Sequence, residues 1–143
     1  MTVKRILVPV DNSELSQRAI DASLELAQQM HAGIVGFVAG TRGARDALID
    51  ETEGDEETGD DALTGRPVLA RFRRAARAAG VPFESVFERV PRVDKAIIAA
   101  AEAHRCDLIV MVTHGRGVFG EFLFGSQTKA VLAGSKLPLL VLH

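Results

Sequence analysis

The sequence has no tryptophan, no tyrosine and only one cysteine among its 143 residues. A single cysteine cannot build a disulfide framework, which indicates a reducing compartment. No apolar run approaches the roughly 18 residues that a membrane-spanning helix needs, and the N-terminus lacks the long apolar stretch of a signal peptide. We therefore expect a cytoplasmic protein with no membrane partner.

Basic residues are missing from one acidic segment. Nine of the 19 acidic residues fall between positions 46 and 61, where there is no Lys or Arg. The rest of the chain holds all 17 basic residues, so the formal net charge of −2 combines a mildly basic body with an acidic stretch. We interpret positions 41–61 as an acidic, flexible insertion in a single domain that covers residues 1–143.

Apolar segments alternate along the chain with segments of helical periodicity. The five apolar runs, each typical of a strand, are Ile6–Val10, Ile34–Ala39, Val81–Val86, Leu108–Val112 and Leu137–Leu142. Apolar stripes at helical spacing begin at Leu15, Leu69, Val93 and Thr128, and Ser13 is a suitable N-cap for the first of these helices. The order predicts an α/β fold with a doubly wound parallel sheet.

In such a sheet, ligands bind beyond the carboxyl ends of the strands, where the strand order reverses. The most informative segment there runs from Val112 through four glycines to Thr128. Glycine allows a backbone to approach a ligand closely, and the helix that begins near Ser126 offers N–H donors to an anion. A plain turn followed by an N-cap explains Gly125-Ser126 equally well.

Two nucleotide-binding fingerprints fit this loop poorly. Residues 115–120 match G-x-G-x-x-G, but no strand with a terminal acidic residue follows at the required distance. Residues 120–126 resemble a P-loop that lacks its lysine, so a P-loop NTPase is disfavoured.

The ordered set of motifs resembles the universal stress protein family over nearly the whole chain. Residues 6–13 (ILVPVDNS) are similar to the first strand and turn of the family, and residues 106–111 (CDLIVM) to its fourth strand. Gly115, nine further residues and Gly125-Ser126 resemble its ATP motif, and residues 138–141 (PLLV) resemble its closing strand. The expected fold is a single five-stranded parallel sheet, Rossmann-like and similar to the adenine nucleotide α-hydrolases, with strand order 3-2-1-4-5.

The resemblance implies a stress-response protein that binds ATP, with Mg²⁺ carried mainly by the triphosphate. Asp11 and the end of the second strand would flank adenine and ribose, and the glycine loop would hold ribose and phosphates. The residues assigned to nucleotide binding are Pro9, Val10, Asp11, Val38, Ala39, Val112, His114, Gly115, Arg116, Gly117, Gly125, Ser126, Gln127 and Thr128. Asp11 also fits a simpler role as a capping acid.

Position 112 departs from the family pattern, because the motif places a glycine where this chain has Val112. A branched side chain there puts methyl groups where the family brings its backbone close to the nucleotide. The family includes members that bind no nucleotide, so a dimeric interaction module without nucleotide is the alternative function. An ATP-hydrolysing enzyme is a further alternative, although we assign no catalytic residue and no metal site, and expect at most weak hydrolysis.

Several other residues have simple structural explanations. Cys106 lies at the amino end of its strand, away from the ligand edge, and fits a buried structural thiol, with Asp107 as a strand-entry cap. The arginines between positions 66 and 77 fit a solvated helix face better than a nucleic-acid surface, since no aromatic residues interleave with them. The last strand, 137–143, is apolar, and we expect it to form a homodimer interface, as in the family.

Overall fold

The structure is a computed structural model that describes residues 1–40, 66–112 and 128–143. The expected insertion at 41–61 and most of the glycine loop lie outside the described residues. The strands are β1 (Arg5–Pro9), β2 (Gly33–Gly40), β3 (Phe83–Arg89), β4 (Leu108–Val112) and β5 (Leu139–Leu142). The helices are α1 (Leu15–Met30), α4 (Arg66–Ala79) and α5 (Val93–Ala103), and residues 128–134 are also helical.

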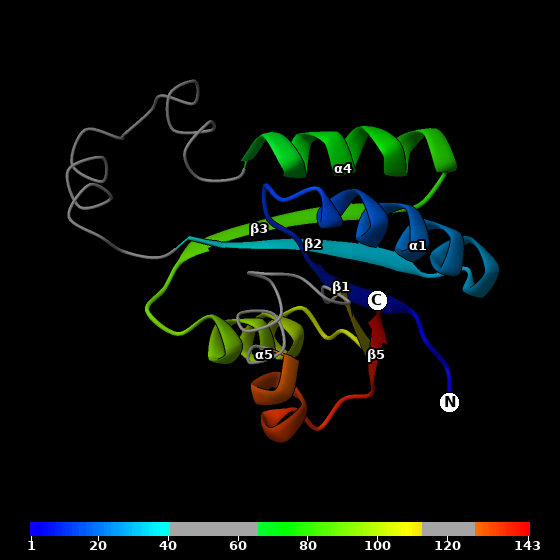
Figure 1. Ribbon diagram of the computed structural model, residues 1–143. Helices are drawn as coiled ribbons and strands as arrows, with labels where there is room; N and C mark the ends of the chain where they lie inside the picture. Colours follow the sequence, from blue (N-terminus) through cyan, green and yellow to red (C-terminus); the bar gives the residue numbers. More distant parts are fainter. Residues whose placement is uncertain (41–65, 113–127) are drawn as a thin grey trace.

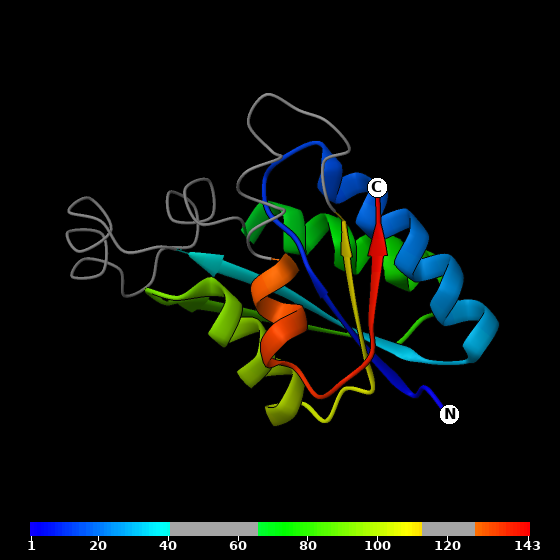
Figure 2. The same ribbon diagram turned by 60° about the horizontal axis from the view of Figure 1, so that its bottom comes forward.

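The five strands form one parallel sheet in the order β3-β2-β1-β4-β5, which confirms the predicted fold. Helices α1 and α4 cover one face, and α5 with the helical residues 128–134 covers the other (Figure 1). The C-terminus lies at the carboxyl end of β5 (Figure 2). Since both faces are covered, β4 is buried along its whole length, as its continuous apolar run predicted.

Each face of the sheet has its own hydrophobic core. Ile6, Val8 and Phe72 belong to the core beneath α1 and α4. Leu7 and Ile97 belong to the core beneath α5. Because neighbouring strand residues point to opposite faces, one strand supplies side chains to both cores.

Several predicted boundaries differ from the observed ones, those of β1 and β2 by one residue. The third strand begins at Phe83, not Val81, and continues to Arg89. It is an edge strand, so its exposed end alternates polar and apolar residues and escaped a search for apolar runs. The fifth strand begins after Pro138, and Ser13 does not cap α1, whose N-cap is Glu14.

Candidate functional site at the carboxyl edge of the sheet

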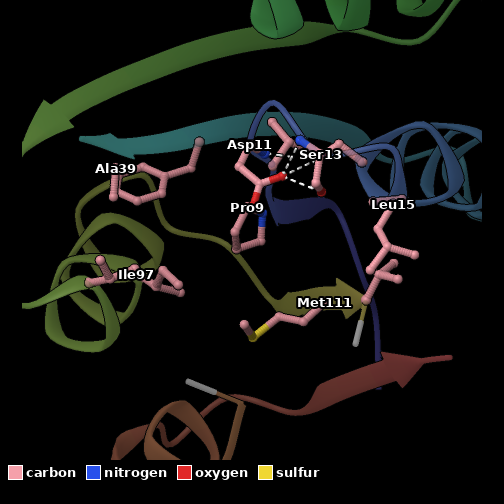
Figure 3. Close-up of a pocket in the computed structure, with 13 residues that line it drawn as sticks. Pro9, Asp11, Ser13, Leu15, Ala39, Ile97 and Met111 are labelled. Atoms are coloured by element: carbon pink, nitrogen blue, oxygen red, sulfur yellow. Dashed lines mark hydrogen bonds between the residues drawn. The ribbon is translucent and has the colours of Figure 1, made fainter. Parts of the chain in front are cut away.

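A cavity of about 350 Å³ lies at the carboxyl edge, where the strand order reverses between β1 and β4. The residues that line it come from β1 and the turn after it, α1, β2, α5 and β4. They are Pro9, Val10, Asp11, Ser13, Leu15, Ser16, Ala19, Phe37, Ala39, Val93, Ile97, Met111 and Val112. Figure 3 shows labelled members of this set surrounding the same space. Its size and position are those of a small-molecule site in an open α/β sheet.

Asp11 organises the polar end of the cavity. Its Oδ1 accepts hydrogen bonds from the backbone N–H of Ser13 (2.8 Å), the Ser13 hydroxyl (2.5 Å) and the Ser16 hydroxyl (3.0 Å). The backbone N–H of Asp11 donates in turn to the Ser16 hydroxyl oxygen at 2.7 Å. All donors to the carboxylate among the described residues converge on Oδ1, which leaves Oδ2 able to accept from a ligand.

This network explains why Ser13 is not the N-cap of α1. Its hydroxyl donates to Asp11 instead of accepting a bond from the first turn of the helix. The carboxylate thereby ties the turn after β1 to Ser16 in the first turn of α1. The capping role considered for Asp11 and a ligand-facing role are compatible, because they use different oxygens.

The remaining walls are mainly apolar. Phe37 and Ala39 come from β2, Val93 and Ile97 from α5, and Met111 from β4. Asp11 is the only ionisable side chain among the described lining residues. The described part of the cavity therefore suits a mostly uncharged, flat or aliphatic group that offers one or two hydrogen-bond donors.

An ion pair fixes the beginning of α5, which supplies two of these wall residues. Arg92 donates from Nε and Nη2 to the two carboxylate oxygens of Asp94, at 3.2 and 3.1 Å. The hydrogen bond from Arg92 lowers the pKa of the buried Asp94, so the carboxylate stays ionised in the first turn of the helix. An anion there interacts favourably with the helix dipole.

The structure brings together five of the predicted binding residues and places a sixth elsewhere. Pro9, Val10, Asp11, Ala39 and Val112 all line the cavity. Val38 is buried in the core beneath α1 and α4, because it points to the face of β2 opposite Phe37 and Ala39.

Thr128 is buried, with 9% of its surface exposed, and its hydroxyl has no hydrogen-bond partner within the described residues. Burying a hydroxyl without a hydrogen-bond partner costs folding free energy. A hydrogen bond between the Thr128 hydroxyl and a ligand or water would remove this cost. The other predicted residues lie outside the described part of the chain. They are His114, Gly115, Arg116, Gly117, Gly125, Ser126 and Gln127.

Sequence reasoning missed part of the cavity wall. Phe37 and Met111 each directly precede a predicted site residue, Val38 and Val112, and this neighbourhood is what could have identified them. Val93 and Ile97 were recognised only as an apolar helix stripe. A stripe cannot reveal which of its members extends past the core to the sheet edge.

The opposite, amino edge of the sheet holds Cys106 and Asp107, as predicted. Cys106 is 5% exposed, and burial raises the pKa of its thiol to about 11. Asp107 Oδ2 accepts from the backbone N–H groups of Lys4 (2.7 Å) and Arg5 (3.0 Å), which joins the start of β1 to β4.

No helix in the described ranges is long and apolar enough to cross a bilayer. Within residues 1–40, 66–112 and 128–143, no group of three or more His, Cys, Asp or Glu side chains is placed to hold a metal ion.

Comparison with known proteins gives consistent matches. The model of the universal stress protein family matches residues 2–143. A universal stress protein encoded in the QAH/OAS sulfhydrylase 3′ region of Thermus aquaticus is 33% identical, and the alignment covers 98% of each chain. A solved member of the family from Burkholderia pseudomallei is 25% identical, with a TM-score of 0.73 and coverage of 98% of this chain and 96% of that one. A universal stress protein solved in complex with cAMP is 23% identical, with a TM-score of 0.69 and coverage of 100% and 98%.

Proposed function

The chain belongs to the universal stress protein family, and from this we propose that it is a stress-response protein that binds ATP at the carboxyl-edge cavity. In this proposal, the nucleoside lies against the apolar walls and Asp11 Oδ2 accepts a hydrogen bond from a hydroxyl or amino group. The triphosphate extends toward the segment between Val112 and Thr128. Mg²⁺ is carried mainly by the triphosphate.

The observation that carries the proposal is the Asp11 network beside an apolar cavity. Three donors hold Oδ1 and thereby orient the carboxylate, so Oδ2 is positioned before any ligand arrives. An adenine ring fits walls such as Ala39 and Ile97, which exclude water without offering competing polar groups. The lack of a basic group among the described lining residues fits the uncharged nucleoside part of ATP.

The phosphates need donors from elsewhere, and the sequence supplies them in the segment that contains Arg116 and Ser126. The buried hydroxyl of Thr128, which has no hydrogen-bond partner among the described residues, supports this assignment from the far end of the same segment. The solved relative in complex with cAMP lends further support, since its ligand is also an adenine nucleotide.

The absence of Trp and Tyr allows a direct test of the purified protein. Its own near-ultraviolet absorbance is very weak, so a co-purified purine nucleotide would dominate that part of the spectrum and would appear in a heat-released extract. Added Mg·ATP should raise the melting temperature, and the rise should continue with the logarithm of the ATP concentration once this exceeds the dissociation constant. A preparation with no bound nucleotide and no response of the melting temperature to Mg·ATP would reject the proposal.

Val112 favours a second function, a nucleotide-free interaction module. Its branched side chain lines the cavity, at the position where the family motif has glycine. If the wild-type protein binds no nucleotide, Val112→Gly should show a rise of the melting temperature with increasing Mg·ATP that the wild type lacks. If neither the wild type nor Val112→Gly responds to Mg·ATP, the interaction module is the better account of the function. Val112 is then not the reason why the protein binds no nucleotide.

The proposal includes a cytoplasmic homodimer formed through the last strand. Among the described strands, β5 pairs only with β4, so its outer edge is unpaired. Leu140 on this strand is 39% exposed. An exposed apolar edge strand favours association with a second copy, which would cover it.

A further inference from the structure

The chain contains three methionines, and the structure describes all of them. Met1 and Met30 are exposed, with 92% and 40% of their surfaces accessible to solvent. Met111 in β4 is 4% exposed, and it lines the carboxyl-edge cavity. Its thioether sulfur therefore lies beside the space that the proposed function assigns to the nucleoside.

The direction of the Met111 side chain follows from the alternation of β4. Val110 and Val112 belong to the core beneath α1 and α4, so Met111 points to the opposite face of the sheet, where α5 packs. Figure 3 shows its side chain extending from β4 toward Ile97, another wall residue of the cavity. The cavity volume of about 350 Å³ is several times the roughly 30 Å³ that one water molecule occupies in the liquid. Hydrogen peroxide is little larger than water, so it has room to reach the sulfur when no ligand fills the cavity.

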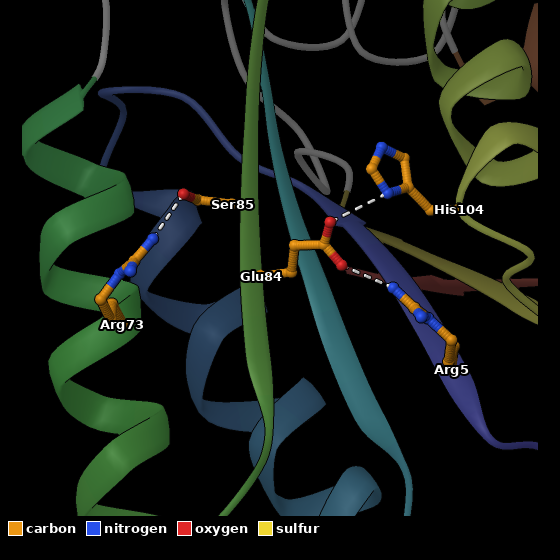
Figure 4. A network of polar contacts seen from close by, with 5 residues as sticks. All are labelled: Arg5, Arg73, Glu84, Ser85 and His104. Carbon is orange, nitrogen blue, oxygen red and sulfur yellow. Dashed lines mark hydrogen bonds and ion pairs between the residues drawn. The ribbon is translucent and has the colours of Figure 1, made fainter.

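The single cysteine is less suited to react with a peroxide. Burial raises the pKa of the Cys106 thiol to about 11, and the charge of Arg5 offsets this only in part. Arg5 is itself paired with Glu84 at 2.7 Å, and the other carboxylate oxygen of Glu84 lies 3.2 Å from His104 (Figure 4). The thiol is therefore neutral near pH 7, whereas a thioether reacts with peroxide without first losing a proton.

The cavity around Met111 offers little to a polar group on that side chain. Its walls are mainly apolar, and the two hydroxyls among the described lining residues, those of Ser13 and Ser16, both donate to Asp11 Oδ1. A sulfoxide oxygen at position 111 is hydrogen-bonded by water while the cavity is wet. Once a nucleoside displaces that water, the oxygen has no donor among the described lining side chains, and an unpaired polar group in an apolar wall weakens binding.

We propose that Met111 is a modification site, where hydrogen peroxide converts the thioether to a sulfoxide and thereby lowers the affinity of the cavity for nucleotide. A sulfur lone pair attacks one peroxide oxygen and the O–O bond breaks. The proton on the transferred oxygen passes to the leaving hydroxide, so one water is released. The sulfur loses two electrons and the peroxide gains them. This inference rests on the proposed function, and it implies that bound nucleotide protects Met111, because the nucleoside fills the path to the sulfur.

The test is treatment of the full-length protein with hydrogen peroxide, followed by peptide mass spectrometry and calorimetric titration of Mg·ATP. We expect one added oxygen on Met111 in the nucleotide-free protein. With Mg·ATP at about 100 times its dissociation constant, roughly 1% of the protein is unoccupied, so oxidation of Met111 should slow at least about tenfold. The exposed Met30 is the internal reference, because its oxidation should not depend on ATP. Oxidation of Met111 should lower ATP affinity roughly tenfold or more.

Two substitutions separate Met111 from general oxidative damage. Met111→Leu keeps an apolar side chain of similar volume and has no sulfur there, so its ATP affinity should be the same before and after peroxide treatment. Met30→Leu is the matched control, because Met30 does not line the cavity. In this variant the fraction of binding capacity that peroxide weakens should equal the fraction of Met111 that carries an added oxygen. Melting temperatures without ATP verify that each treated protein is folded.

The proposal is overturned if Met111 stays unmodified while Met30 is fully oxidised, if Mg·ATP does not slow the oxidation of Met111, or if the oxidised protein binds ATP as tightly as before. An equal loss of affinity in peroxide-treated Met111→Leu would also overturn it. The untreated protein distinguishes the two proposals. If it binds no Mg·ATP, the proposed function fails and this inference fails with it, whereas equal binding before and after oxidation rejects this inference alone.

Discussion

At the scale of single residues, the two carboxylate oxygens of Asp11 are assigned different roles, one structural and one in ligand binding. Its Oδ1 holds the turn after β1 through bonds from Ser13 and Ser16, and Oδ2, which accepts from none of the described residues, is the proposed ligand contact. The two roles can be separated by substitution, because asparagine keeps one carbonyl oxygen and replaces the other with a donor.

Asp11→Asn should therefore keep the stability of the protein within about 1 kcal/mol while lowering ATP affinity roughly tenfold or more. Asp11→Ala should lower both, since it leaves the serine donors unpaired and costs about 1–3 kcal/mol of folding free energy. Urea unfolding measures the first quantity and calorimetric titration the second. Unchanged ATP affinity in Asp11→Asn would exclude Oδ2 as a ligand contact.

Cys106 predicts a pH dependence at the opposite edge of the sheet. Burial raises the pKa of its thiol from 9.0 to about 11, although the charge of Arg5 opposes this. The unfolded chain therefore loses the thiol proton at a lower pH than the folded chain does. The stability associated with the neutral thiol is fully present below about pH 9 and is lost as the pH rises toward about 11.

Urea unfolding at increasing pH should show a steeper loss of stability in the wild type than in Cys106→Ala across this range. Alkylation by iodoacetamide at neutral pH should be slow in the folded protein and fast in urea. Rapid alkylation of the folded protein would contradict the burial of this thiol.

At the scale of secondary structure elements, β2 shows how a glycine allows two aromatic side chains to pack on a strand. The Phe72 and Phe83 rings lie 4.9 Å apart between centroids. A Cβ built at Gly36 would lie 2.8 Å from the Phe83 ring and 3.2 Å from the Phe72 ring. Residue 36 must therefore be glycine for α4 and β3 to approach β2 this closely.

Gly36→Ala should destabilise the fold by about 1–3 kcal/mol through overpacking. Gly33→Ala, in the same strand, is the matched control, since its nearest neighbours would lie at 3.4 Å, an ordinary contact distance. The difference between the two midpoints of urea unfolding measures the effect. Equal midpoints would show that the two rings move apart at little cost.

The elements also show what the sequence could and could not predict. The buried strands β1 and β4 were found to within one residue because both faces are covered, which produces continuous apolar runs. The helix ends were harder to predict. The glycine after α4, Gly80 (φ 72°), is a residue type that commonly ends helices, but α1 and α5 are followed by left-handed residues that are not glycine, His31 (φ 56°) and Arg105 (φ 55°). Side chains rarely adopt this conformation, so no propensity indicates it.

At the scale of the whole molecule, the described residues form one cavity at the carboxyl edge of the sheet and another at the amino edge. Crossovers on both sides of β1 and β4 create the carboxyl-edge cavity, and alternating hydrophobic segments were enough to predict it. The cavity at the amino edge, whose lining includes Lys4, His31 and Glu84, was not predicted, because no motif relates these residues. Motifs identify sites built from neighbouring residues, and this pocket is built from distant ones.

The proposed homodimer is tested by charging the outer strand. Light scattering should give the mass of a dimer for the wild type and of a monomer for Leu140→Lys, because a lysine there disrupts an apolar edge. Met30→Lys is the matched control, since Met30 at the end of α1 is 40% exposed against 39% for Leu140. If Leu140→Lys is still a dimer, the dimer interface does not involve β5.

The most direct test of the nucleotide site is calorimetric titration of Mg·ATP into the wild type and into Ala39→Leu. Ala39 lines the cavity, so the larger side chain fills the space assigned to the nucleoside, whereas Ala78→Leu on the exposed face of α4 serves as the control. We predict one saturable site per chain in the wild type and in Ala78→Leu, and at least a tenfold loss of affinity in a folded Ala39→Leu. No binding to the wild type, or full affinity in Ala39→Leu, would contradict the assignment of this cavity to ATP.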